Sequence, residues 1–470
     1  MESICAFQYT LLFVPIKSVH ITNYYHKNSG GISTSYNHLL EAANRHRRFV
    51  RLIVPGEREE TENVGEFGKI YYVPARYSPI FDKRYRVMMP WQYMLKDSII
   101  RRILLSEMPD MIEVIDKYTL SIIGPMIRTN NFKALGRPMV VHFSCERMDD
   151  NVGSFLSEGR FAKRLTRFMI GNYTLPGFDY HLANSVYTAQ EFFDAVDKEK
   201  NPSRSGKLFN FLWRFFRSPR VSPGERIFVC NRGADIEQFS PERGSATKRR
   251  EILARAELPE DAVILLYAGR ISPEKNIGLL VDLMKTLADD QDNDFRLLVA
   301  GAGPKSDWLQ EQADKRARGK IVQLGHLDKE ELADYYANID VFVHPNPREP
   351  FGIGPLEAMA SGVPTLVPNG GGVLSYATNE NSWIAEPTGM DFAGAVRNII
   401  GDESLRRRKI EKAMEMTKDH TQEASMDHQL ATYDMLYEDF QKRNDLFTDI
   451  KKARDFDFVN ELFRSESQKL

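Results

Sequence analysis

The chain has 470 residues, of which 42% are hydrophobic and 27% are charged, and its formal net charge is −2. This length predicts two domains, and the composition is ordinary for a globular protein. A near-neutral chain gives no support to nucleic-acid binding, which depends on a basic surface.

The cysteines and the apolar runs bear on location. Cys5, Cys145 and Cys230 show neither metal-ligand spacing nor a disulfide framework, which indicates a reducing compartment. The first fifteen residues include an acidic Glu2 and no basic segment, so they do not predict a signal peptide. No apolar run reaches the roughly 20 residues that span a bilayer. We therefore expect a cytoplasmic protein.

The first half of the chain alternates short apolar runs with amphipathic stretches. Residues 33–45 and 91–106 have helical patterns and lie between predicted strands. Strands that alternate with helices favour a parallel sheet covered by helices on both faces. The predicted strands are residues 11–14, 51–54, 70–73, 111–114, 139–142, 180–183 and 226–230.

A polar, charged stretch around residues 235–261 is interpreted as a link to a second half of the same style. Two Rossmann-like domains would follow, with ligands at the carboxyl ends of their strands. The predicted strands of the second half are residues 263–268, 296–300, 321–324, 341–344 and 365–367. The predicted domains are residues 1–240, residues 241–424, and C-terminal helices with a tail over 425–470 that packs on the rest of the protein.

Two glutamates stand in a strand-loop-helix arrangement in the second half. Residues 339–345 indicate a buried strand, and Glu349 and Glu357 follow it eight positions apart, with glycines between them. The amides at a helix start beside such a loop suit a pyrophosphate. Carboxylates accept hydrogen bonds from hydroxyls, so a glutamate on each side suits a ligand with sugars at both ends of that pyrophosphate. A nucleotide sugar has this shape.

A second anion site is predicted after the strand 263–268. That strand ends in Gly269 and Arg270, and Lys275 follows five residues later near a helix start. Arginine offers a planar fork of donors and lysine a compact charge, and phosphates suit both. The alternative is a pair of solvated surface cations, which the nearby Glu349 segment makes the weaker interpretation.

Two signals in the first half are weaker. Gly30 and Gly31 precede a helix, where amides can approach an anion without a Cβ clash, although an ordinary turn fits equally. His142 ends a predicted strand, where it can face a ligand crevice or serve as a structural histidine. The Asp-x-Asp patterns at 292–294 and 455–457 have no further ligand at metal spacing, so no metal site is predicted.

These motifs together resemble the retaining glycosyltransferases of family four, which have the GT-B fold. The segment from Glu349 to Glu357 carries most of the resemblance, which extends from the first Gly-Gly to about Tyr437. The resemblance implies an α/β GT-B protein, with two Rossmann-like domains facing a central cleft and a C-terminal helix crossing back to the N-terminal domain. Supporting matches are Gly269-Arg270 with Lys275, Gly30-Gly31, Ala183-Asn184-Ser185, and residues 231–235, 239–241 and 433–437.

The resemblance also implies roles for individual residues. Arg270 and Lys275 would neutralise the donor pyrophosphate, helped by backbone amides at the helix starts. Glu349 would bind the transferred sugar, Glu357 the ribose, and His142 would lie beside the reacting sugar. No divalent metal or other cofactor is expected. The predicted catalytic residues are thus His142 and Glu349, and the predicted donor-binding residues are Gly30, Gly31, Arg270, Lys275, Ile353, Gly354 and Glu357.

Residues 204–220 form a basic and aromatic segment. They contain five cations and no acidic residue, interleaved with phenylalanine, leucine and tryptophan side chains. Such a segment can lie in the headgroup region of an anionic membrane, and a second basic stretch, 160–168, precedes it. The alternative is that Phe209, Leu212, Trp213 and Phe216 dock onto the protein's own core.

The resulting expectation is a retaining transferase that moves a hexose, glucose or mannose, from a nucleoside-diphosphate sugar to an acceptor hydroxyl. The acceptor is a glycan or lipid, reached at the inner face of a membrane. The alternatives are a non-catalytic subunit that keeps the GT-B fold, or another nucleotide-sugar enzyme such as an epimerase. The intact set Arg270, Lys275, Glu349 and Glu357 favours the transferase.

Overall fold

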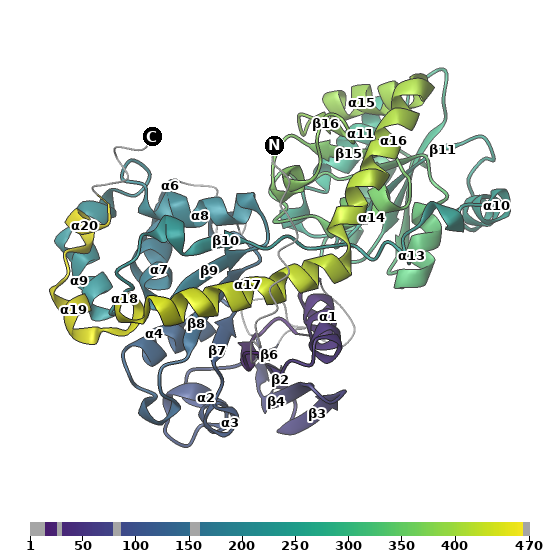
Figure 1. Cartoon of the computed structure of the whole chain (residues 1–470). Coiled ribbons are helices and arrows are strands. Elements are labelled where there is room, and N and C mark those ends of the chain that lie inside the picture. The colour runs from purple at the N-terminus through teal and green to yellow at the C-terminus, as the bar shows by residue number, and fades with distance from the viewer. Residues whose placement is uncertain (1–14, 26–30, 79–85, 151–159, 464–470) are drawn as a thin grey trace. The chain divides into compact units, whose positions relative to one another are not determined.

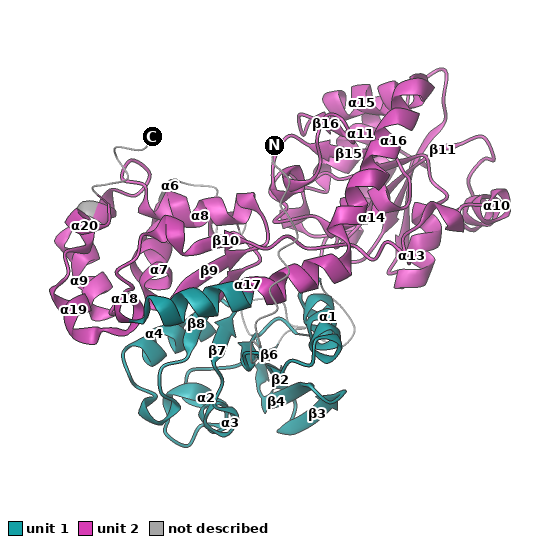
Figure 2. Ribbon diagram, viewed as in Figure 1, with its two compact units in different colours: residues 1–141, 433–444 teal, residues 142–432, 445–470 magenta. Residues whose placement is uncertain are grey.

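A computed structural model describes residues 15–25, 31–78, 86–150 and 160–463. The chain divides into two compact units: residues 1–141 with 433–444, and residues 142–432 with 445–470 (Figure 2). This division differs from the predicted domains, whose boundaries after residues 240 and 424 stay predictions. Among the described residues, no helix is both long and apolar enough to cross a membrane.

Unit 1 is built on a mostly parallel sheet with strand order β7-β1-β2-β4-β3. Parallel pairing joins β1 to β2 and β7, and β2 to β4, while β3 pairs with β4 in the antiparallel sense. Its helices are α1 (Gly31–Arg45), α2 (Trp91–Met94), α3 (Ile99–Glu107) and α4 (Ile123–Arg128), and its strands are β1 (Ser18–Ile21), β2 (Val50–Gly56), β3 (Glu60–Val64), β4 (Gly68–Pro74), β5 (Arg76–Tyr77), β6 (Arg86–Val87) and β7 (Met111–Val114).

Helix α17 (Gln422–Lys442), the long yellow helix of Figure 1, begins in unit 2 and ends in unit 1. Within unit 1 the hydroxyl of Tyr433 donates a hydrogen bond to Glu113, and Arg48 pairs with Asp434. Leu436 of the same helix is 1% exposed. A C-terminal helix that crosses back to the N-terminal part of the chain is thereby confirmed.

The first part of unit 2 carries the strands β8 (Met139–Ser144), β9 (Tyr180–Ala183) and β10 (Ile227–Val229), in the order β10-β9-β8. Strand β8 begins at the end of unit 1. The helices of this part are α6 (Arg160–Met169), α7 (Leu175–Gly177), α8 (Val186–Val196) and α9 (Lys207–Phe215). The side chain of Ser185 caps α8 by accepting a hydrogen bond from the amide of Thr188.

The second part of unit 2 is a wholly parallel, six-stranded sheet with strand order β13-β12-β11-β14-β15-β16. Its strands are β11 (Val263–Ala268), β12 (Phe295–Ala300), β13 (Ile321–Gly325), β14 (Val341–Val343), β15 (Thr365–Pro368) and β16 (Trp383–Ala385). Its helices are α10 (Ala246–Arg255), α11 (Gly278–Leu287), α12 (Ser306–Arg316), α13 (Lys329–Tyr336), α14 (Ile353–Ala360), α15 (Gly389–Gly401) and α16 (Glu403–Thr417).

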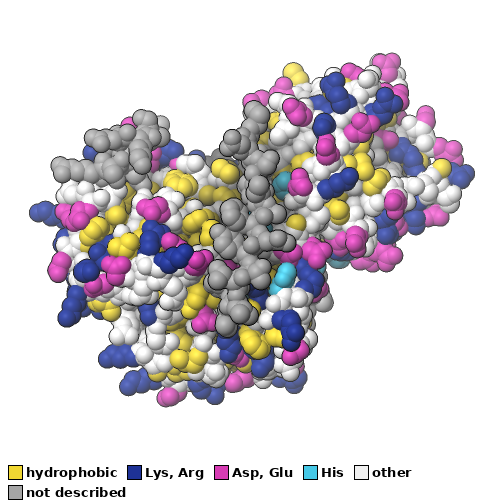
Figure 3. Space-filling view, viewed as in Figure 1, with side chains coloured by type: hydrophobic (Ala, Val, Ile, Leu, Met, Phe, Trp, Pro, Cys, Tyr) yellow, Lys and Arg dark blue, Asp and Glu magenta, His cyan; other side chains and the backbone are white. Residues whose placement is uncertain are grey.

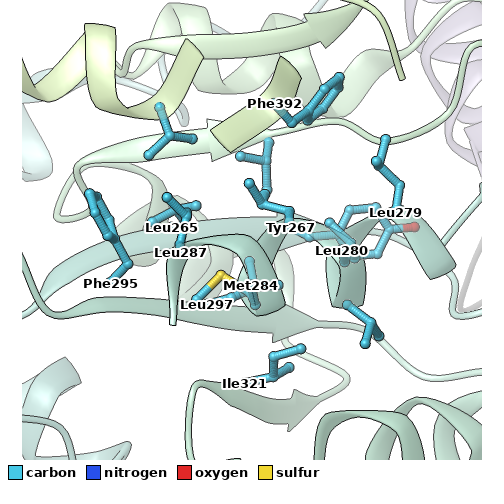
Figure 4. Close-up of a cluster of buried hydrophobic side chains, with 14 of the residues drawn as sticks. Leu265, Tyr267, Leu279, Leu280, Met284, Leu287, Phe295, Leu297, Ile321 and Phe392 are labelled. Carbon is cyan, nitrogen blue, oxygen red and sulfur yellow. The ribbon is translucent and has the colours of Figure 1, made fainter. Parts of the chain in front are cut away.

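Alternation along the strands of this sheet divides its core into two layers. Leu265 and Tyr267 of β11 pack with α11 and α15, as Figure 4 shows, whereas Ile264 and Leu266 belong to a separate cluster with α10 and α13. A period of two sends successive side chains to opposite faces, so a strand covered by helices on both faces is apolar throughout. The run of residues 263–268 therefore has no polar face.

The C-terminal tail packs on α9. Helices α18 (Asn444–Thr448), α19 (Ile450–Asp455) and α20 (Phe458–Glu461) bring Phe458 and Phe463 against Trp213, with ring centroids 5.5 Å apart in both pairs. Phe209 and Trp213 are fully buried. The prediction that the tail packs on the protein is confirmed. The alternative that aromatic residues of 204–220 dock onto the core is confirmed for Phe209 and Trp213.

Most predicted elements are present, with some differences. The predicted helix 91–106 is two helices, because Leu95 and Ser98 have extended backbones between them. The stretch 235–261 is not all linker, since α10 lies in it. The predicted strand 11–14 lies outside the described residues, and the sequence patterns missed β1, β3, β5, β6 and β16.

Candidate active site

The strand order of the six-stranded sheet marks where a ligand can bind. The chain runs outward from β11 through β12 to β13, then returns to the other side of β11 as β14. The loops after β11 and β14 therefore leave the sheet in opposite directions, which opens a crevice at the carboxyl ends of these two strands. Arg270 and Lys275 follow β11, and Glu349 follows β14.

The loop after β11 is positioned by its backbone. Gly269 has φ +155°, and a short 3-10 helix, Pro273–Lys275, precedes Asn276, which adopts a left-handed conformation. The Asn276 side chain donates to the carbonyl of Pro345 at 2.8 Å and so ties this loop to the one after β14. Arg270 is partly exposed, with its Nη1 4.0 Å from Glu274 Oε1.

Glycines after β12 bring a third loop against this one. A Cβ on Gly301 would lie 2.0 Å from the carbonyl oxygen of Gly269, and one on Gly303 would lie 2.2 Å from that of Ile271. Only glycine allows such an approach between backbones. The sequence analysis missed both residues, although the Gly-Ala-Gly directly after a predicted strand was the signal that could have found them.

Glu349 is the centre of the site's charge network. Lys275 Nζ donates to both of its carboxylate oxygens, at 2.9 and 2.8 Å, and Asn346 Nδ2 donates to Oε2 at 3.1 Å. Burial alone would raise the pKa of Glu349, but the charge and hydrogen bonds of Lys275 outweigh it and lower that pKa to about 2. Burial lowers the pKa of His344, 3.7 Å away, to about 4, so Lys275 is the cation that compensates Glu349 at neutral pH.

The loop that carries Glu349 is held by the glycines after β15. The amide of Gly372 donates to the carbonyl of Glu349 at 2.6 Å, and a Cβ on Gly372 would lie 1.9 Å from the carbonyl of Pro350. The hydroxyl of Ser185, at the start of α8, also donates to Pro350, at 2.5 Å. These contacts fix the backbone around Glu349, so the three glycines at 370–372 have a packing role.

Helix α14 begins directly after this loop. Gly352, with φ +86°, turns the chain into the helix, and Tyr376 donates to its carbonyl. The amides of Ile353 and Gly354 are in the first turn, where they have no partner within the helix and can bind an anion. Gly354 approaches the end of β11, since a Cβ there would lie 3.6 Å from the carbonyl of Ala268.

Glu357 lies one turn further along α14 and contacts the chain weakly. Its Oε2 is 3.5 Å from the hydroxyl of Tyr336, at the end of α13. Burial raises the pKa of Glu357 to about 7, and the more distant charge of Lys329 only partly opposes this. Two acidic side chains of one loop-helix segment thus differ by about five units of pKa, because only Glu349 has a cation in contact.

The structure places His142 in a cluster of aromatic rings. It is 0% exposed, and its ring centroid is 5.3 Å from that of Phe178 and 5.8 Å from those of His181 and Phe192. The alternation of β8 turns this side chain into the aromatic core beneath α8. The full burial of the ring favours the structural alternative, and the contact of His142 with the reacting sugar stays a prediction.

The remaining predicted residues are accounted for as follows. Gly30 lies outside the described residues, and Gly31 is the first residue of α1 in unit 1. Arg270, Lys275, Glu349, Ile353, Gly354 and Glu357 all lie on the loops and helix that leave β11 and β14. Among the described residues, no group of three or more His, Cys, Asp or Glu side chains is arranged to hold a metal ion. That the donor binds without a metal stays a prediction.

This arrangement suits a ligand that carries both negative charge and hydroxyl groups. Lys275, Arg270 and the α14 amides supply donors for an anion, while Glu349 and Glu357 supply acceptors on either side of those amides. The hydrogen bonds among Lys275, Glu349 and Asn346 hold these side chains in place before a ligand binds. Less free energy is then needed to orient them during a reaction.

Comparisons with known proteins agree with this description. The family described as "Glycosyl transferases group 1" matches residues 248–416, which contain the whole network. The chain is 26% identical over 398 residues to GDP-mannose-dependent alpha-(1-6)-phosphatidylinositol dimannoside mannosyltransferase of Mycobacterium tuberculosis, covering 84% of this chain and 90% of the relative. It is 24% identical over 420 residues to GDP-mannose-dependent alpha-mannosyltransferase of Corynebacterium glutamicum, covering 87% and 86%.

Solved structures share the fold at lower identity. Sucrose-phosphate synthase of Thermosynechococcus elongatus has a TM-score of 0.67 at 16% identity, covering 90% of this chain and 100% of that one. HepE of Anabaena, in complex with UDP and glucose, has a TM-score of 0.61 at 14% identity, covering 89% and 99%. The fold has two Rossmann-like domains with parallel sheets, as predicted. Residues 248–416 thus match the group 1 glycosyltransferases, and the chain shares the GT-B fold of the solved structures.

Proposed function

We propose that this chain transfers a hexose, mannose or glucose, from a nucleoside-diphosphate sugar to a hydroxyl of a lipid or lipid-linked acceptor, with retention at the anomeric carbon. The observation that carries the proposal is the Lys275–Glu349 pair at the switch point between β11 and β14, next to the first turn of α14. It offers a cation for the diphosphate and a carboxylate for the sugar.

In the proposed reaction the donor diphosphate lies against Arg270, Lys275 and the amides of Ile353 and Gly354. Glu349 orients the hydroxyls of the transferred sugar, and Glu357 accepts hydrogen bonds from the ribose. The family resemblance implies that the leaving phosphate takes the proton of the acceptor hydroxyl on the same face of the sugar. The rate then comes from positioning and from stabilisation of the diphosphate charge.

The relatives suggest which donors and acceptors to test first. Both relatives described above are named as GDP-mannose-dependent, and one of these two names includes a phosphatidylinositol dimannoside. Other relatives are named D-inositol 3-phosphate glycosyltransferases, one from Streptomyces avermitilis at 30% identity over 39% of this chain. We therefore propose GDP-mannose first, then UDP-glucose, with inositol-containing lipids as acceptors. The cytoplasmic location predicted from the sequence is part of the same proposal.

The first test is calorimetric binding of GDP and of UDP to the purified chain without added metal. Tight binding of one of them supports the donor site and identifies the nucleoside. Binding of neither would contradict the proposed use of Lys275 and Arg270.

The second test separates sugar transfer from nucleotide binding. Glu349→Ala should reduce transfer by about 100-fold or more while nucleoside diphosphate affinity changes far less, because the carboxylate is assigned to the sugar. Glu380→Ala, at an exposed residue of the same half of the chain, is the control and should leave both unchanged. Equal losses of transfer and binding for Glu349→Ala would contradict its assignment, and a non-catalytic subunit would show no transfer to begin with.

A further inference from the structure

Helix α9 presents two apolar faces, of which the described part of the chain covers only one. Phe209 and Trp213, four positions apart, are fully buried against the tail and the core. Leu208, Phe211 and Phe215 lie together on another side of the helix and are 54%, 60% and 58% exposed. Residues three and four apart share a helix face, so these three side chains form one continuous apolar strip.

The helix is firmly fixed to the protein on its covered side. Trp213 Nε1 donates to the carbonyl of Gly171 at 2.9 Å, and Arg214 Nε donates to that of Phe456 at 2.8 Å. The side chain of Asn210 accepts from the amide of Phe458 at 3.1 Å. The exposed strip is therefore held in place by contacts that do not involve it, and the rings of Phe211 and Phe215 stack on each other at 6.2 Å.

Exposed cations lie on the helix of the strip and on the helix packed beside it, although one of them, Lys452, also pairs with Asp445 and Asp449. Lys207 is exposed at the start of α9, and Lys451, Lys452 and Arg454 are exposed on α19, which packs beside α9. Burial lowers the pKa of the Arg217 guanidinium, and the charge of Arg454 lowers it further. In Figure 3 the hydrophobic side chains (yellow) intermix with Lys and Arg (dark blue) and some acidic groups over the part of the surface that Figure 1 labels α9 and α19.

The acidic residues of this region are largely engaged with the protein itself. Asp445 pairs with Arg220, with Oδ2 and Nη2 3.4 Å apart, and Asp449 caps α19 by accepting from two of its amides. Asp457 accepts from the amide of Asn460 and so caps α20. Asp455 and Glu461 are exposed. The strip itself adjoins Lys207 and carries no acidic side chain, because residues 204–220 contain none.

We infer that the strip formed by Leu208, Phe211 and Phe215 is a docking surface for a membrane that contains anionic lipids. Exposed aromatic and leucine side chains enter the boundary between headgroups and acyl chains, and nearby cations are attracted to the surface charge. A protein partner or a second copy would also cover apolar side chains, but the adjacent cations match an anionic lipid surface in charge. The membrane contact predicted for residues 204–220 is thereby limited to one face of α9, since Phe209 and Trp213 pack against the tail and the core.

Docking through α9 would bring the enzyme to an acceptor that resides in the bilayer. This link to the acceptor rests on the proposed function, but vesicle binding does not. Membrane binding and nucleotide binding can therefore be measured separately on the same preparation, so that failure of one is distinguished from failure of the other.

The test is sedimentation of the full chain with phosphatidylcholine vesicles that contain about one third phosphatidylglycerol, compared with phosphatidylcholine alone. The wild-type chain should bind the anionic vesicles more tightly, and added salt should weaken that binding. The triple variant Leu208→Ser, Phe211→Ser, Phe215→Ser should lose about tenfold or more of the binding, since it removes the side chains that enter the lipid. Lys207→Glu should weaken binding to anionic vesicles only, by about fivefold.

The control variant is Trp91→Ser with Leu95→Ser. It removes apolar side chains that are 57% and 62% exposed in unit 1, where we place no membrane contact. It should bind vesicles like the wild type. All variants should keep the thermal unfolding midpoint and the nucleoside diphosphate affinity of the wild type.

Three results would overturn the inference. These are an absence of wild-type binding at low salt, equal losses for the control and the triple variant, and unchanged binding of a folded triple variant. If light scattering instead showed a wild-type dimer that the triple variant converts to a monomer, with vesicle binding unchanged, the strip would be an interface between copies of this chain.

Discussion

Buried glutamates in the two units are satisfied in different ways. In unit 1, Glu113 is fully buried, and its carboxylate accepts from His20 at 2.9 Å, from Tyr36 at 3.0 Å and from Tyr433. In unit 2, Glu357 has one long contact, to Tyr336 at 3.5 Å. Burial would raise both pKa values, yet that of Glu113 is lowered by its partners while that of Glu357 rises to about 7.

The number of hydrogen-bond donors separates a structural carboxylate, Glu113, from Glu357, whose oxygens can still accept hydrogen bonds. Glu113 lies on β7 and joins β1, α1 and α17, so its partners come from three separate elements and all of them are the chain's own. Glu349 is intermediate, because Lys275 and Asn346 hold it but its loop follows β14, at the switch point of the sheet. A buried polar group that has few hydrogen-bond partners within the protein is a candidate to bind a ligand.

The largest expected effect is on stability in unit 1. Glu113→Ala should lower the free energy of unfolding by about 3–5 kcal/mol, because it leaves His20 and two tyrosine hydroxyls buried without their acceptor. Urea unfolding followed by circular dichroism measures this loss. Tyr433→Phe, which removes a single donor, should cost only about 1–2 kcal/mol. If Glu113→Ala lowered the free energy of unfolding by less than about 1 kcal/mol, Glu113 would not be the structural carboxylate that distinguishes it from Glu357.

Lys275→Ala should come next, because it leaves the carboxylate of Glu349, 13% exposed, without its cation. We expect a loss of about 1–3 kcal/mol in stability, which Glu349→Gln in the same chain should partly restore. The pKa of Glu349 is lowered to about 2, so the stabilisation is complete above the ordinary value near 4.5 and is lost as pH falls towards 2. The difference between wild type and Lys275→Ala in urea unfolding should therefore shrink below pH 4.5. A difference that stays constant down to pH 2.5 would contradict the pairing.

The sequence placed the residues of this network together, but it did not predict the burial of the histidine. Lys275, Glu349 and Glu357 lie directly after apolar strands in a segment whose spacing is specific, and parallel strands bring their carboxyl ends to one edge of the sheet. His142 also ends a predicted strand, but the strand continues to Ser144, so His142 lies inside a strand that is buried throughout. The pattern of residues 139–142 holds no information about α8.

Other features depend on contacts between distant segments. The approach of Gly301 to Gly269, and of Gly372 to Pro350, becomes visible only when the loops are folded together. The packing of Phe458 and Phe463 on Trp213 joins residues about 250 positions apart. The composition of residues 204–220 predicted an amphipathic segment, but only the structure shows which of its aromatic side chains the tail covers.

Arg270→Ala should affect ligand binding and leave stability unchanged, because the side chain is 36% exposed. We expect nucleoside diphosphate affinity to fall by roughly 1.5–3 kcal/mol if the guanidinium contacts the diphosphate. Calorimetry measures the loss, and Arg318→Ala, at an exposed arginine in the same half of the chain, should show none. Unchanged affinity for Arg270→Ala would remove this residue from the donor site.

The smallest effect concerns the protonation of Glu357. Its pKa of about 7 means that about half of the free protein carries a neutral Glu357 at neutral pH. Ribose hydroxyls donate hydrogen bonds, which favour the charged carboxylate, so binding should lower this pKa and release a fraction of a proton. Wild-type affinity for the nucleoside diphosphate, relative to Glu357→Gln, should therefore rise severalfold from pH 6 to pH 8 and then level off.

Proton release distinguishes this effect from titration of the nucleotide. Calorimetry at pH 7 in two buffers that differ in ionisation enthalpy gives the number of protons released on binding. The phosphate contributes equally in wild type and in Glu357→Gln, so their difference reports Glu357 alone. Because the carboxylate of Glu113 already has three donors within the chain, no ligand can use it in this way. Equal proton release by the two proteins would mean that Glu357, like Glu113, serves the fold and does not meet the ribose.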